Sequence, residues 1–376
     1  MIDDRPLRVL AVSHAAVIDV NQEPFAALAD DGADVAVVVP RALDTDIRGR
    51  VTLTELPGSK ARLIPLGVLG GFKPVIGQRG IHLITYRGLR DVLKSETADV
   101  VFVEEEPHSV AALQVARESV RFVVHENQNV ARRLPPPFRQ MRARVLRKGA
   151  GVTVRNDTAE GVVRALGFTG PVGRFPHGVD IARYVEPVRR RSDLPRPVIG
   201  FVGRLVPEKG IMDLIAAVAA MEQDASLLVV GDGPLRDEAR ARATQLGIRN
   251  EFAGAVPHDE VPQWYASMDL VAVPSLSTRT WKEQFGRIVI EANAAGVPVV
   301  VSDSGELAKT VATTAGGAIV REGDVAALTA ALDRFCGADD RGRGMGEAGR
   351  AAVARLFSPH AIARELHRFL REVART

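Results

Sequence analysis

The sequence predicts an α/β protein with two domains, each built around a parallel β-sheet. Its 376 residues exceed the size at which one hydrophobic core keeps growing, so two domains of under about 200 residues each are expected. In both halves, short β-branched runs alternate with longer helical stretches, as in repeated strand–helix–strand units. A segment rich in arginine and proline, residues 183–197, interrupts this pattern and is interpreted as a linker.

Each half contains a series of apolar runs that we predict as strands. Because the runs are continuous rather than alternating, helices are expected to cover both faces of each sheet. In the first domain, residues 1–182, the predicted strands are 7–13, 34–40, 98–104, 121–126 and 151–155. In the second domain, residues 198–357, they are 197–203, 226–233, 250–254, 269–275, 297–303 and 316–320.

Two Rossmann-like domains of similar size therefore form the expected architecture. Ligands of such sheets bind at the carboxyl ends of the strands, so a cleft between two facing domains is expected to hold the ligand. The C-terminal segment, about residues 358–376, is expected to be a helix that can pack back on the first domain.

Composition and charge exclude several classes of protein. With 46% hydrophobic and 25% charged residues, the chain is typical of globular proteins. Its single cysteine, Cys336, excludes a disulfide framework and a multi-cysteine zinc site. The N-terminus lacks the features of a secretory signal, and no apolar run approaches the ~18 residues of a membrane-spanning helix. A cytoplasmic location is therefore expected.

Basic residues gather in residues 131–150, which contain no acid. One interpretation is a solvated helix face. The other is a surface that meets a phosphorylated acceptor or anionic lipids, which would place the protein at the inner face of the membrane. Nucleic acid is not an expected partner, because aromatic residues make up only 5% of the chain and no stacking or zinc motif occurs. The oligomeric state is not predicted.

The segment GRLVPEKG follows the first predicted strand of the second domain. It places Gly203, Arg204 and Lys209 in a loop at the carboxyl end of that strand. Arg204 can donate two hydrogen bonds to a phosphate while Lys209 adds a compact charge, a pair suited to a departing diphosphate. The alternative is a pair of exposed cations neutralised by Glu208. No GxGxxG motif follows any strand, which disfavours a dinucleotide oxidoreductase.

The segment KEQFGRIVIEANAAG, from residue 282, carries two glutamates eight positions apart. If a turn at Phe285 and Gly286 precedes a helix that begins near Arg287, the free N–H groups as far as Ile288 point at an anion. Glu283 then precedes the helix, and Glu291 lies about one turn inside it, ~7 Å further along the axis.

These two acids suggest a clamp for a sugar nucleotide. A carboxylate accepts paired hydrogen bonds from vicinal hydroxyls, so one glutamate can hold a ribose and the other a sugar ring, with a diphosphate between them. The alternative makes Glu283 a favourable first-turn acid and Glu291 a solvated helix position.

The motifs GRLVPEKG, GDGPL, VPSL and KEQFGRIVIEANAAGVPVVVSDSGELAKTV, in this order, resemble the second domain of retaining GT-B glycosyltransferases. These form the large group 1 family, which includes sucrose-phosphate synthase and mannosyltransferases. The resemblance covers about residues 197–320 and continues more loosely through HENQN and PHGVD in the first half. It implies the GT-B fold and transfer of a hexose-type sugar from a nucleoside-diphosphate sugar, with UDP expected first and GDP second. The acceptor would be a hydroxyl or thiol of a small molecule, a natural product, or a glycan or lipid-linked precursor.

Carried over by position, the resemblance assigns individual residues. Arg204 and Lys209 would bind the donor diphosphate, Glu283 the transferred sugar and Glu291 the ribose. His125, which ends a strand in HENQN, would contact the sugar near the reaction centre; the alternative is a satisfied hydrogen-bonding histidine. The expected catalytic residues are His125, Arg204, Lys209 and Glu283. The expected donor-binding residues are Gly203, Arg204, Lys209, Phe285, Gly286, Arg287, Ile288 and Glu291.

Acceptor binding is predicted from polar residues of the first domain. They follow its strands, and they are His14, Asn21, Glu106 and Asn127. For the segment EEEPHS, which contains Glu106, the alternative is a capped helix start with solvated acids.

Three features depart from the family pattern. The segment SHAAVIDVNQ lacks the glycine pair common after the first strand, so donor contacts are expected mainly in the second domain. His177 in PHGVD has no assigned function. The DTD segment at 44–46 lies far from the phosphate motifs, and we predict no essential metal and no cofactor.

The mechanism implied by the resemblance retains the anomeric configuration. No carboxylate is placed as an evident nucleophile, so same-face attack assisted by the leaving phosphate is favoured, with Arg204 and Lys209 stabilising the departing charge. An inverting route with His14 as general base is the alternative mechanism. The alternative functions are a nucleotide-sugar epimerase of the same fold and a non-catalytic sugar-nucleotide binder.

Overall fold

The chain divides into two compact units in the computed structural model. Unit 1 comprises Met1–Pro176 and Pro359–Thr376, and unit 2 comprises His177–Ser358. The boundary at 176 lies close to the expected end of the first domain at 182. The structure describes residues 5–45, 49–70, 80–131, 133–185, 190–279, 281–337 and 341–376.

Unit 1 contains a parallel sheet with the strand order β11-β10-β9-β8-β1-β2-β5. The five predicted strands are present, and β5 and β11 were not predicted. The strands are β1 (Arg8–Val12), β2 (Asp34–Pro40), β5 (Arg62–Leu66), β8 (Val100–Val103), β9 (Phe122–Glu126), β10 (Gly151–Val154) and β11 (Val172–Arg174). Two antiparallel pairs lie outside this sheet, β3 (Ala42–Thr45) with β4 (Gly49–Thr52) and β6 (Val68–Leu69) with β7 (Thr85–Tyr86).

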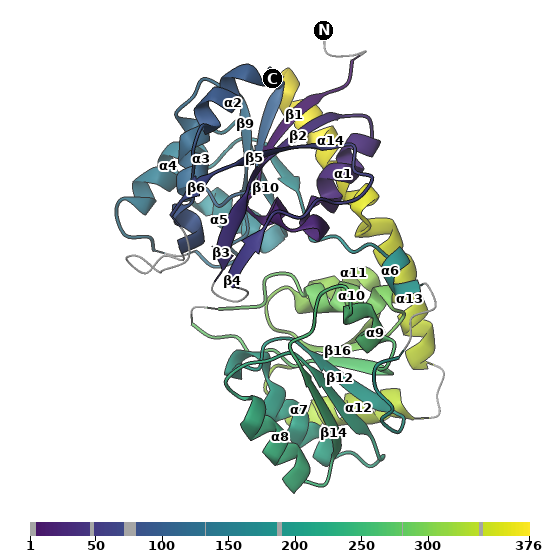
Figure 1. The fold of residues 1–376 in the computed structure, drawn as a ribbon. Coiled ribbons are helices and arrows are strands. Elements are labelled where there is room, and N and C mark those ends of the chain that lie inside the picture. Colours follow the sequence, from purple (N-terminus) through teal and green to yellow (C-terminus); the bar gives the residue numbers. More distant parts are fainter. Residues whose placement is uncertain are drawn as a thin grey trace. The chain divides into compact units, whose positions relative to one another are not determined.

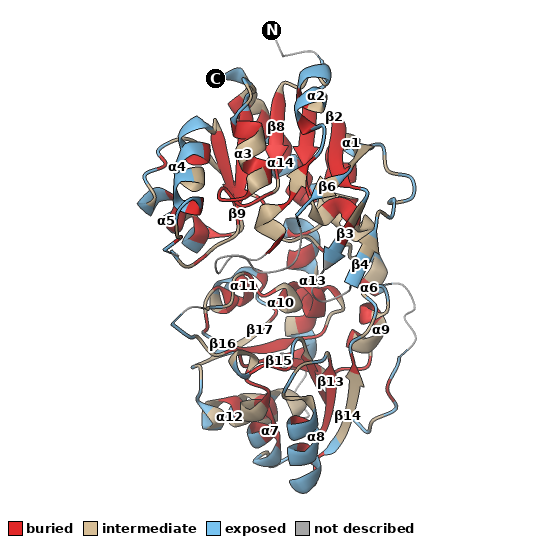
Figure 2. Ribbon diagram, turned by 60° about the vertical axis from the view of Figure 1, so that its left-hand side comes forward, coloured by how far each residue is buried: buried red, intermediate tan, exposed pale blue. Residues whose placement is uncertain are grey.

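Helices cover both faces of this sheet, which explains its continuous apolar strands. Within β1, Leu10 and Val12 pack toward α2–α5, whereas Val9 and Ala11 pack toward α1 and α14. Figure 2 shows the central strands of this sheet as buried. The helices are α1 (Glu23–Asp30), α2 (Leu89–Ser95), α3 (Val110–Ala116), α4 (Phe138–Lys148), α5 (Asp157–Ala165) and α14 (Pro359–Arg375), with 3-10 turns η1 (Ala15–Val17), η2 (Asp19–Gln22) and η3 (Gly80–Leu83).

The last helix of the chain, α14, lies in unit 1 beside α1 (Figure 1). Leu366 and Leu370 are fully buried there against the sheet. His367 adds a polar contact, because its Nδ1 lies 2.7 Å from Asp31 Oδ2 at the end of α1. The C-terminal segment thus packs on the unit that the sequence analysis assigned to it.

Unit 2 contains a second parallel sheet, with the order β14-β13-β12-β15-β16-β17. These six strands match the six predicted. They are β12 (Val198–Val202), β13 (Ser226–Val230), β14 (Arg249–Gly254), β15 (Leu270–Val273), β16 (Val299–Ser302) and β17 (Gly317–Val320). The helices are α6 (Ala182–Val185), α7 (Ile211–Ala219), α8 (Arg236–Gln245), α9 (Val261–Tyr265), α10 (Arg287–Ala294), α11 (Leu307–Thr314), α12 (Val325–Cys336) and α13 (Arg341–Leu356), with the 3-10 turn η4 (Pro207–Lys209).

Each sheet has a point at which the strand order reverses. In unit 1 the chain fills one side of β1 and then crosses to β8 on the other side, and in unit 2 it makes the same change between β12 and β15. Crevices at the carboxyl ends of such strand pairs are the usual ligand sites of open parallel sheets. The loops after β1, β8, β12 and β15 are therefore the places to look for function.

The segment interpreted as a linker packs largely on unit 2. Ser192 is buried, and its hydroxyl donates to Glu251 Oε2 over 2.6 Å. Ser226 Oγ donates to the carbonyl of Pro195 over 2.6 Å. The first residues of this segment, 183–185, belong to α6, and residues 186–189 lie outside the described part. Side-chain hydrogen bonds hold the rest, residues 190–197, without regular secondary structure. Within the described ranges, no helix is both long and apolar enough to cross a bilayer.

Candidate active site

The loops after β12 and β13 pack backbone against backbone, as their glycines require. Gly231 has φ 137°, and a Cβ added there would lie 1.9 Å from the carbonyl oxygen of Gly203. A residue with a side chain does not fit this contact. The glycines in GDGPL thus allow the loop after β13 to pack against the GRLVPEKG loop. This contact fixes the backbone of the loop that carries Arg204 and Lys209.

Lys209 and Glu283 meet directly, although 74 positions separate them. Lys209 Nζ lies 2.6 Å from Glu283 Oε2, and the two side chains are only 18% and 14% exposed. Ser275 Oγ, in the loop after β15, donates to the same carboxylate oxygen over 3.3 Å. The ammonium also lies 4.9 Å from the ring centroid of Trp281, within range of a cation–π contact. The partner of Lys209 is therefore Glu283 and not Glu208.

Arg204 differs from Lys209 in both exposure and pairing. Its side chain is exposed. The structure records no hydrogen bond or ion pair between it and another described residue. The two cations of the GRLVPEKG loop are therefore one paired, half-buried ammonium and one guanidinium available to a ligand.

Helix α10 begins at Arg287, as the sequence predicted. Gly286 caps it with φ 77° and ψ 51°, and no side chain caps this end. A Cβ on Gly286 would lie 2.7 Å from Leu307 Cδ2, so the position requires glycine for both its conformation and its packing. The amides at the start of α10 and its dipole favour an anion there.

Glu291 is buried and has one protein donor at each carboxylate oxygen, so its interpretation as a solvated helix position is wrong. It is 6% exposed. Arg287 Nε donates to Glu291 Oε1 over 2.8 Å, and the hydroxyl of Tyr265 donates to Oε2 over 3.1 Å. The other end of the Arg287 guanidinium lies 3.2 Å from His258 Nε2. The Arg287 side chain is thus committed to Glu291, and its backbone amide is the part directed to an anion.

Phe285 and Ile288 contribute mainly packing. Phe285 is 7% exposed, and its ring makes edge contacts with His177 at 5.4 Å and with Phe357 at 5.7 Å between centroids. Ile288 packs against the unit 2 core and close to Gly203. The sequence assigned no function to His177. In the structure, its ring packs against Phe285.

In unit 1, His125 is completely buried. Its Nδ1 lies 2.9 Å from Thr153 Oγ1 and its Nε2 2.9 Å from Asn127 Oδ1. Burial, with the charge of Arg155, holds the pKa of His125 well below its usual value, so the imidazole is neutral. Both ring nitrogens are bonded inside the unit. This arrangement matches the alternative of a satisfied histidine, one that orients Asn127.

Asn127 is the partly exposed end of this network. Its Oδ1 also accepts a hydrogen bond of 2.6 Å from Arg155 Nε. Because both contacts use the amide oxygen, the amide nitrogen is the group left to face a ligand.

His14 follows β1 and is tied to Glu105, which follows β8. Its Nδ1 lies 2.7 Å from Glu105 Oε2, and its backbone N–H donates to Oε1 over 2.9 Å. Burial lowers the pKa of His14, but the charge and hydrogen bond of Glu105 outweigh it and leave the pKa raised. Asn21 is turned inward, because its Nδ2 donates to the carbonyl of Ala15 over 2.8 Å. Asn21 therefore closes its own loop rather than presenting its amide to an acceptor.

Glu106 is buried beside a second acid, Glu126, which the sequence analysis did not single out. Gln128 Nε2 donates to Glu106 Oε1 over 3.1 Å. Burial and the neighbouring Glu106 raise the pKa of Glu126 well above its usual value. Burial also raises the pKa of Glu106, but hydrogen bonds from Glu126 and Gln128 reverse this and lower it. Glu126 therefore carries the proton of the pair. Of the alternative given for EEEPHS, the capped helix start is confirmed, because Ser109 caps α3, but solvated acids are wrong for Glu105 and Glu106, which are buried.

Several site residues had no clear sequence signal. Trp281 and Ser275 flank the loop that carries Glu283, and Tyr265 and His258 reach Glu291 and Arg287 from the segment after β14. Asp44 of the DTD segment is exposed and pairs with Arg50 at 3.7 Å, while Asp46 lies outside the described residues. Among the described residues, no three His, Cys, Asp or Glu side chains gather as metal ligands would.

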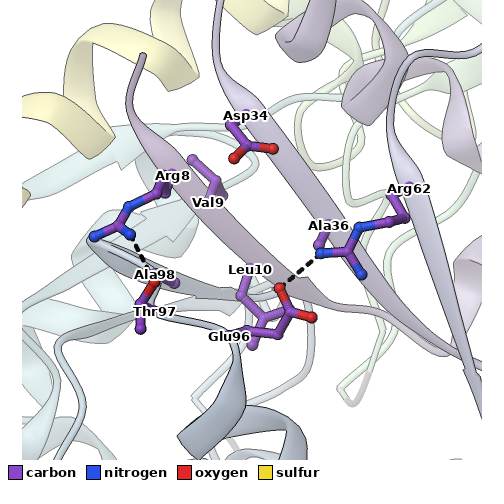
Figure 3. A pocket seen from close by; sticks show the side chains of 9 residues that line it. All are labelled: Arg8, Val9, Leu10, Asp34, Ala36, Arg62, Glu96, Thr97 and Ala98. Carbon is purple, nitrogen blue, oxygen red and sulfur yellow. Dashed lines mark hydrogen bonds and ion pairs between the residues drawn. The ribbon is translucent and has the colours of Figure 1, made fainter. Parts of the chain in front are cut away.

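A pocket of about 200 Å³ in unit 1 lies away from these loops (Figure 3). It lies at the amino ends of β1, β2 and β5, the edge opposite to the predicted ligand sites. Two of its cations have partners within the pocket: Arg62 pairs with Glu96 at 2.6 Å, and Arg8 donates to the hydroxyl of Thr97 over 2.6 Å. The pocket is not part of the candidate site.

Comparison with known proteins bears on the family of this chain. The model of the family "Glycosyl transferases group 1" matches residues 186–352. A 2-deoxystreptamine glucosyltransferase of Streptomyces kanamyceticus is 32% identical over 259 residues, 64% of this chain and 65% of that protein, so the chain spans just under two thirds of that relative. A GDP-mannose-dependent alpha-mannosyltransferase of Mycolicibacterium smegmatis is 31% identical over 321 residues, 81% of this chain and 76% of that protein.

Solved structures extend the likeness to the whole chain. The structure of Anabaena HepE in complex with UDP matches with a TM-score of 0.68 at 19% identity, over 98% of this chain and 100% of that one. At that identity the match shows the fold, which is the two-domain GT-B fold that the sequence predicted. The family model and the match to the Mycolicibacterium smegmatis mannosyltransferase, over 76% of that protein, together show the family. This chain belongs to the group 1 family of glycosyl transferases.

Proposed function

We propose that this protein transfers a hexose-type sugar from a nucleoside-diphosphate sugar to a hydroxyl or thiol acceptor, with retention of configuration. The observation that carries the proposal is in unit 2. The uncapped start of α10 lies between two buried or half-buried glutamates, Glu283 and Glu291, with Lys209 held against the first. This is the order of groups that a sugar, a diphosphate and a ribose require.

The diphosphate is placed at the amides of Gly286 and Arg287, with Arg204 and Lys209 as its cations. The Lys209 ammonium keeps two N–H donors beyond the one given to Glu283, and these suit phosphate oxygens. Glu283 has lone pairs left for a sugar hydroxyl. Because cations and helix amides balance the charge, we propose that no metal and no cofactor is essential.

In the proposed reaction, the bond between the anomeric carbon and the phosphate oxygen breaks and its electron pair stays on the diphosphate. The acceptor oxygen forms the new bond on the same face, and its proton passes to the departing phosphate. Arg204 and Lys209 stabilise the charge that develops. In an inverting reaction, His14, held by Glu105, would act as the general base.

We place the acceptor at the carboxyl ends of β1, β8 and β9 in unit 1. Asn127, His14 and Glu106 lie there, with His125 as the residue that orients Asn127. The relatives support two acceptor and donor types. The Streptomyces relative is named as a glucosyltransferase of 2-deoxystreptamine, an aminocyclitol. The Mycolicibacterium relative is named as a GDP-mannose-dependent mannosyltransferase. The HepE complex supports UDP as the first nucleotide to test and the mannosyltransferase supports GDP as the second.

The proposal is tested by calorimetry with UDP-glucose and GDP-mannose on the wild type, Glu291→Gln and a control. Glu238→Gln on α8 is the matched control, since it makes the same charge change at an exposed site. We expect one nucleotide sugar to bind and Glu291→Gln to weaken that binding at least 10-fold, the size of a lost hydrogen bond to a charged group. If neither sugar nucleotide binds the wild type, the proposed function is wrong.

Product analysis separates the alternatives. The donor that binds is incubated with and without an aminocyclitol or a lipid-linked acceptor, and products are identified by mass spectrometry and NMR. A new glycoside with the donor's anomeric configuration supports the proposal. An altered free sugar without acceptor indicates an epimerase, and tight binding without any product indicates a sugar-nucleotide binder.

We also propose a weak peripheral contact of this otherwise cytoplasmic protein with anionic lipid. The outward face of α4 carries exposed cations, and its buried side is formed by Phe138, Val145 and Leu146. The exposed cations are Arg139, Arg144, Arg147 and Lys148. Each cation near an anionic bilayer contributes about 1 kcal/mol.

Vesicle sedimentation tests this contact. The variant with Arg144→Glu and Arg147→Glu is compared with Arg364→Glu and Arg368→Glu on α14, at the opposite face of the same sheet. Binding to vesicles rich in phosphatidylglycerol that only the α4 variant loses supports the contact. Equal sedimentation of all three proteins would show that α4 is simply a solvated helix.

A further inference from the structure

The carboxylate of Glu291 is held from two sides by different elements. Arg287, one turn earlier on α10, donates to Oε1 at 2.8 Å, and Tyr265, at the end of α9, donates to Oε2 at 3.1 Å. Tyr265 is fully buried and Glu291 nearly so. Each carboxylate oxygen therefore has one protein donor and lone-pair capacity left for one more.

We propose that Tyr265 is a positioning residue for the donor: its hydroxyl fixes the plane of the Glu291 carboxylate so that the two oxygens can accept from the vicinal ribose hydroxyls. This inference rests on the proposed function, in which Glu291 binds the ribose. Arg287 alone holds one oxygen and leaves the carboxylate free to rotate about its terminal bond. The Tyr265 contact to the second oxygen removes that rotation before the ribose arrives.

The chemistry of Tyr265 suits this task. A carboxylate can only accept, so the phenol must donate. Burial, together with the charge of Glu291, raises the pKa of Tyr265 well above its usual value, and the hydroxyl keeps its proton. Arg287 is restrained in turn, because its far nitrogen lies 3.2 Å from His258 Nε2. The ribose acceptor is thus fixed through three side chains, one on α10 and two from the segment after β14.

The test is nucleotide binding by calorimetry to the wild type, Tyr265→Phe and Tyr184→Phe. Tyr184 is the matched control, because it loses the same hydroxyl from the same core cluster and its ring lies 6.1 Å from that of Tyr265. Each protein is titrated with UDP and 2′-deoxy-UDP, and with GDP and 2′-deoxy-GDP. The deoxy compounds report the ribose contact, which a purely structural defect would not change selectively.

We expect the wild type to prefer the ribose form and Tyr265→Phe to lose both affinity, by about 10-fold, and most of that preference. Tyr184→Phe should keep the preference. In turnover, Tyr265→Phe should raise the donor KM and leave kcat within about twofold, since the contact is made equally in ground and transition states.

Each other outcome is decisive. A normal ribose preference in Tyr265→Phe would overturn the inference and leave the proposed function standing. A wild type that binds nucleotide without any ribose preference would overturn the assignment of Glu291 and the inference with it. If Tyr265→Phe does not fold, Arg287→Lys is the second variant, and an unchanged preference there would show that fixing the carboxylate has no effect on binding.

Discussion

Substitution of Gly286 by alanine tests whether the start of α10 is built as the structure indicates. At φ 77° and ψ 51°, a residue with a side chain loses about 1–2 kcal/mol relative to glycine. The new Cβ would also lie 2.7 Å from Leu307 Cδ2, and Leu307 is fully buried. Displacing it overpacks the core at a cost of about 1–3 kcal/mol. The free energy of unfolding of unit 2 should fall by about 2–5 kcal/mol in total.

Gly247→Ala separates the two contributions. Gly247 has φ 75°, nearly the same conformation, but an added Cβ there meets nothing within 4 Å. It ends α8, away from the candidate site. This control should lose only the conformational part, about 1–2 kcal/mol.

The assay is urea unfolding followed by tryptophan fluorescence. Both tryptophans, Trp264 and Trp281, lie in unit 2, so the signal reports that unit alone. Equal losses in the two variants would show that Leu307 moves without cost and would refute the packing argument. The same pair of variants also tests the anion site. Gly286→Ala should weaken binding of whichever nucleotide sugar binds the wild type in the calorimetry proposed above, and Gly247→Ala should not.

Three further predictions address charge. Lys209→Met should lower donor turnover at least about 100-fold in a nucleotide-release assay, because it removes a charge that stabilises the leaving group; a change below tenfold would contradict that role. The raised pKa of His14 stabilises the fold fully below its unfolded value of 6.5, and this stabilisation is lost as pH rises through the folded pKa. His14→Gln should therefore destabilise unit 1 more at pH 5.5 than at pH 9 in urea unfolding followed by circular dichroism, and a pH-independent difference would contradict the Glu105 contact. Hydrogen bonds from Arg5 and Arg8 hold the pKa of Asp99 at about 2, below its usual 3.8, so the stabilisation it provides is present above pH 4 and lost as pH falls to 2. The loss caused by Asp99→Asn should shrink over that acid range, as measured by the same method.

The strands that the sequence predicted and those it missed differ in one respect. In the unit 1 sheet, every predicted strand is an apolar run in the interior of the sheet, where burial on both faces demands such residues. The missed strands of that sheet, β5 and β11, are its two edges. One contains Pro65 and begins with an exposed arginine, and the other has three residues, Val172–Arg174. Edge strands tolerate proline and polar residues, so their sequences carry little strand signal.

For the site, local motifs were predictable and contacts between distant segments were not. The start of α10 followed from a glycine before an apolar run, because helix ends obey local rules. The Lys209–Glu283 pair depends on how the loops after β12 and β15 meet, which no spacing reveals. Tyr265 lies in QWYASMDL, where it is indistinguishable from an ordinary core residue. The burial of His125 and Glu106 likewise depends on neighbours from β10 and β9.

The pairing of these charges explains how the acids and the cations of this site are tolerated together in the fold. A half-buried ammonium without a partner is costly, and so is a buried carboxylate. Glu283 satisfies Lys209 and Arg287 satisfies Glu291 before any ligand is present, so neither charge needs the donor to be tolerated in the fold. Each acid then has lone pairs left for hydroxyls, which are neutral and do not disturb the charge balance. Arg204 is exposed and has no such pair among the described residues. In the proposed function it is the cation whose full charge remains for the diphosphate, and so it should carry most of the salt dependence of donor binding.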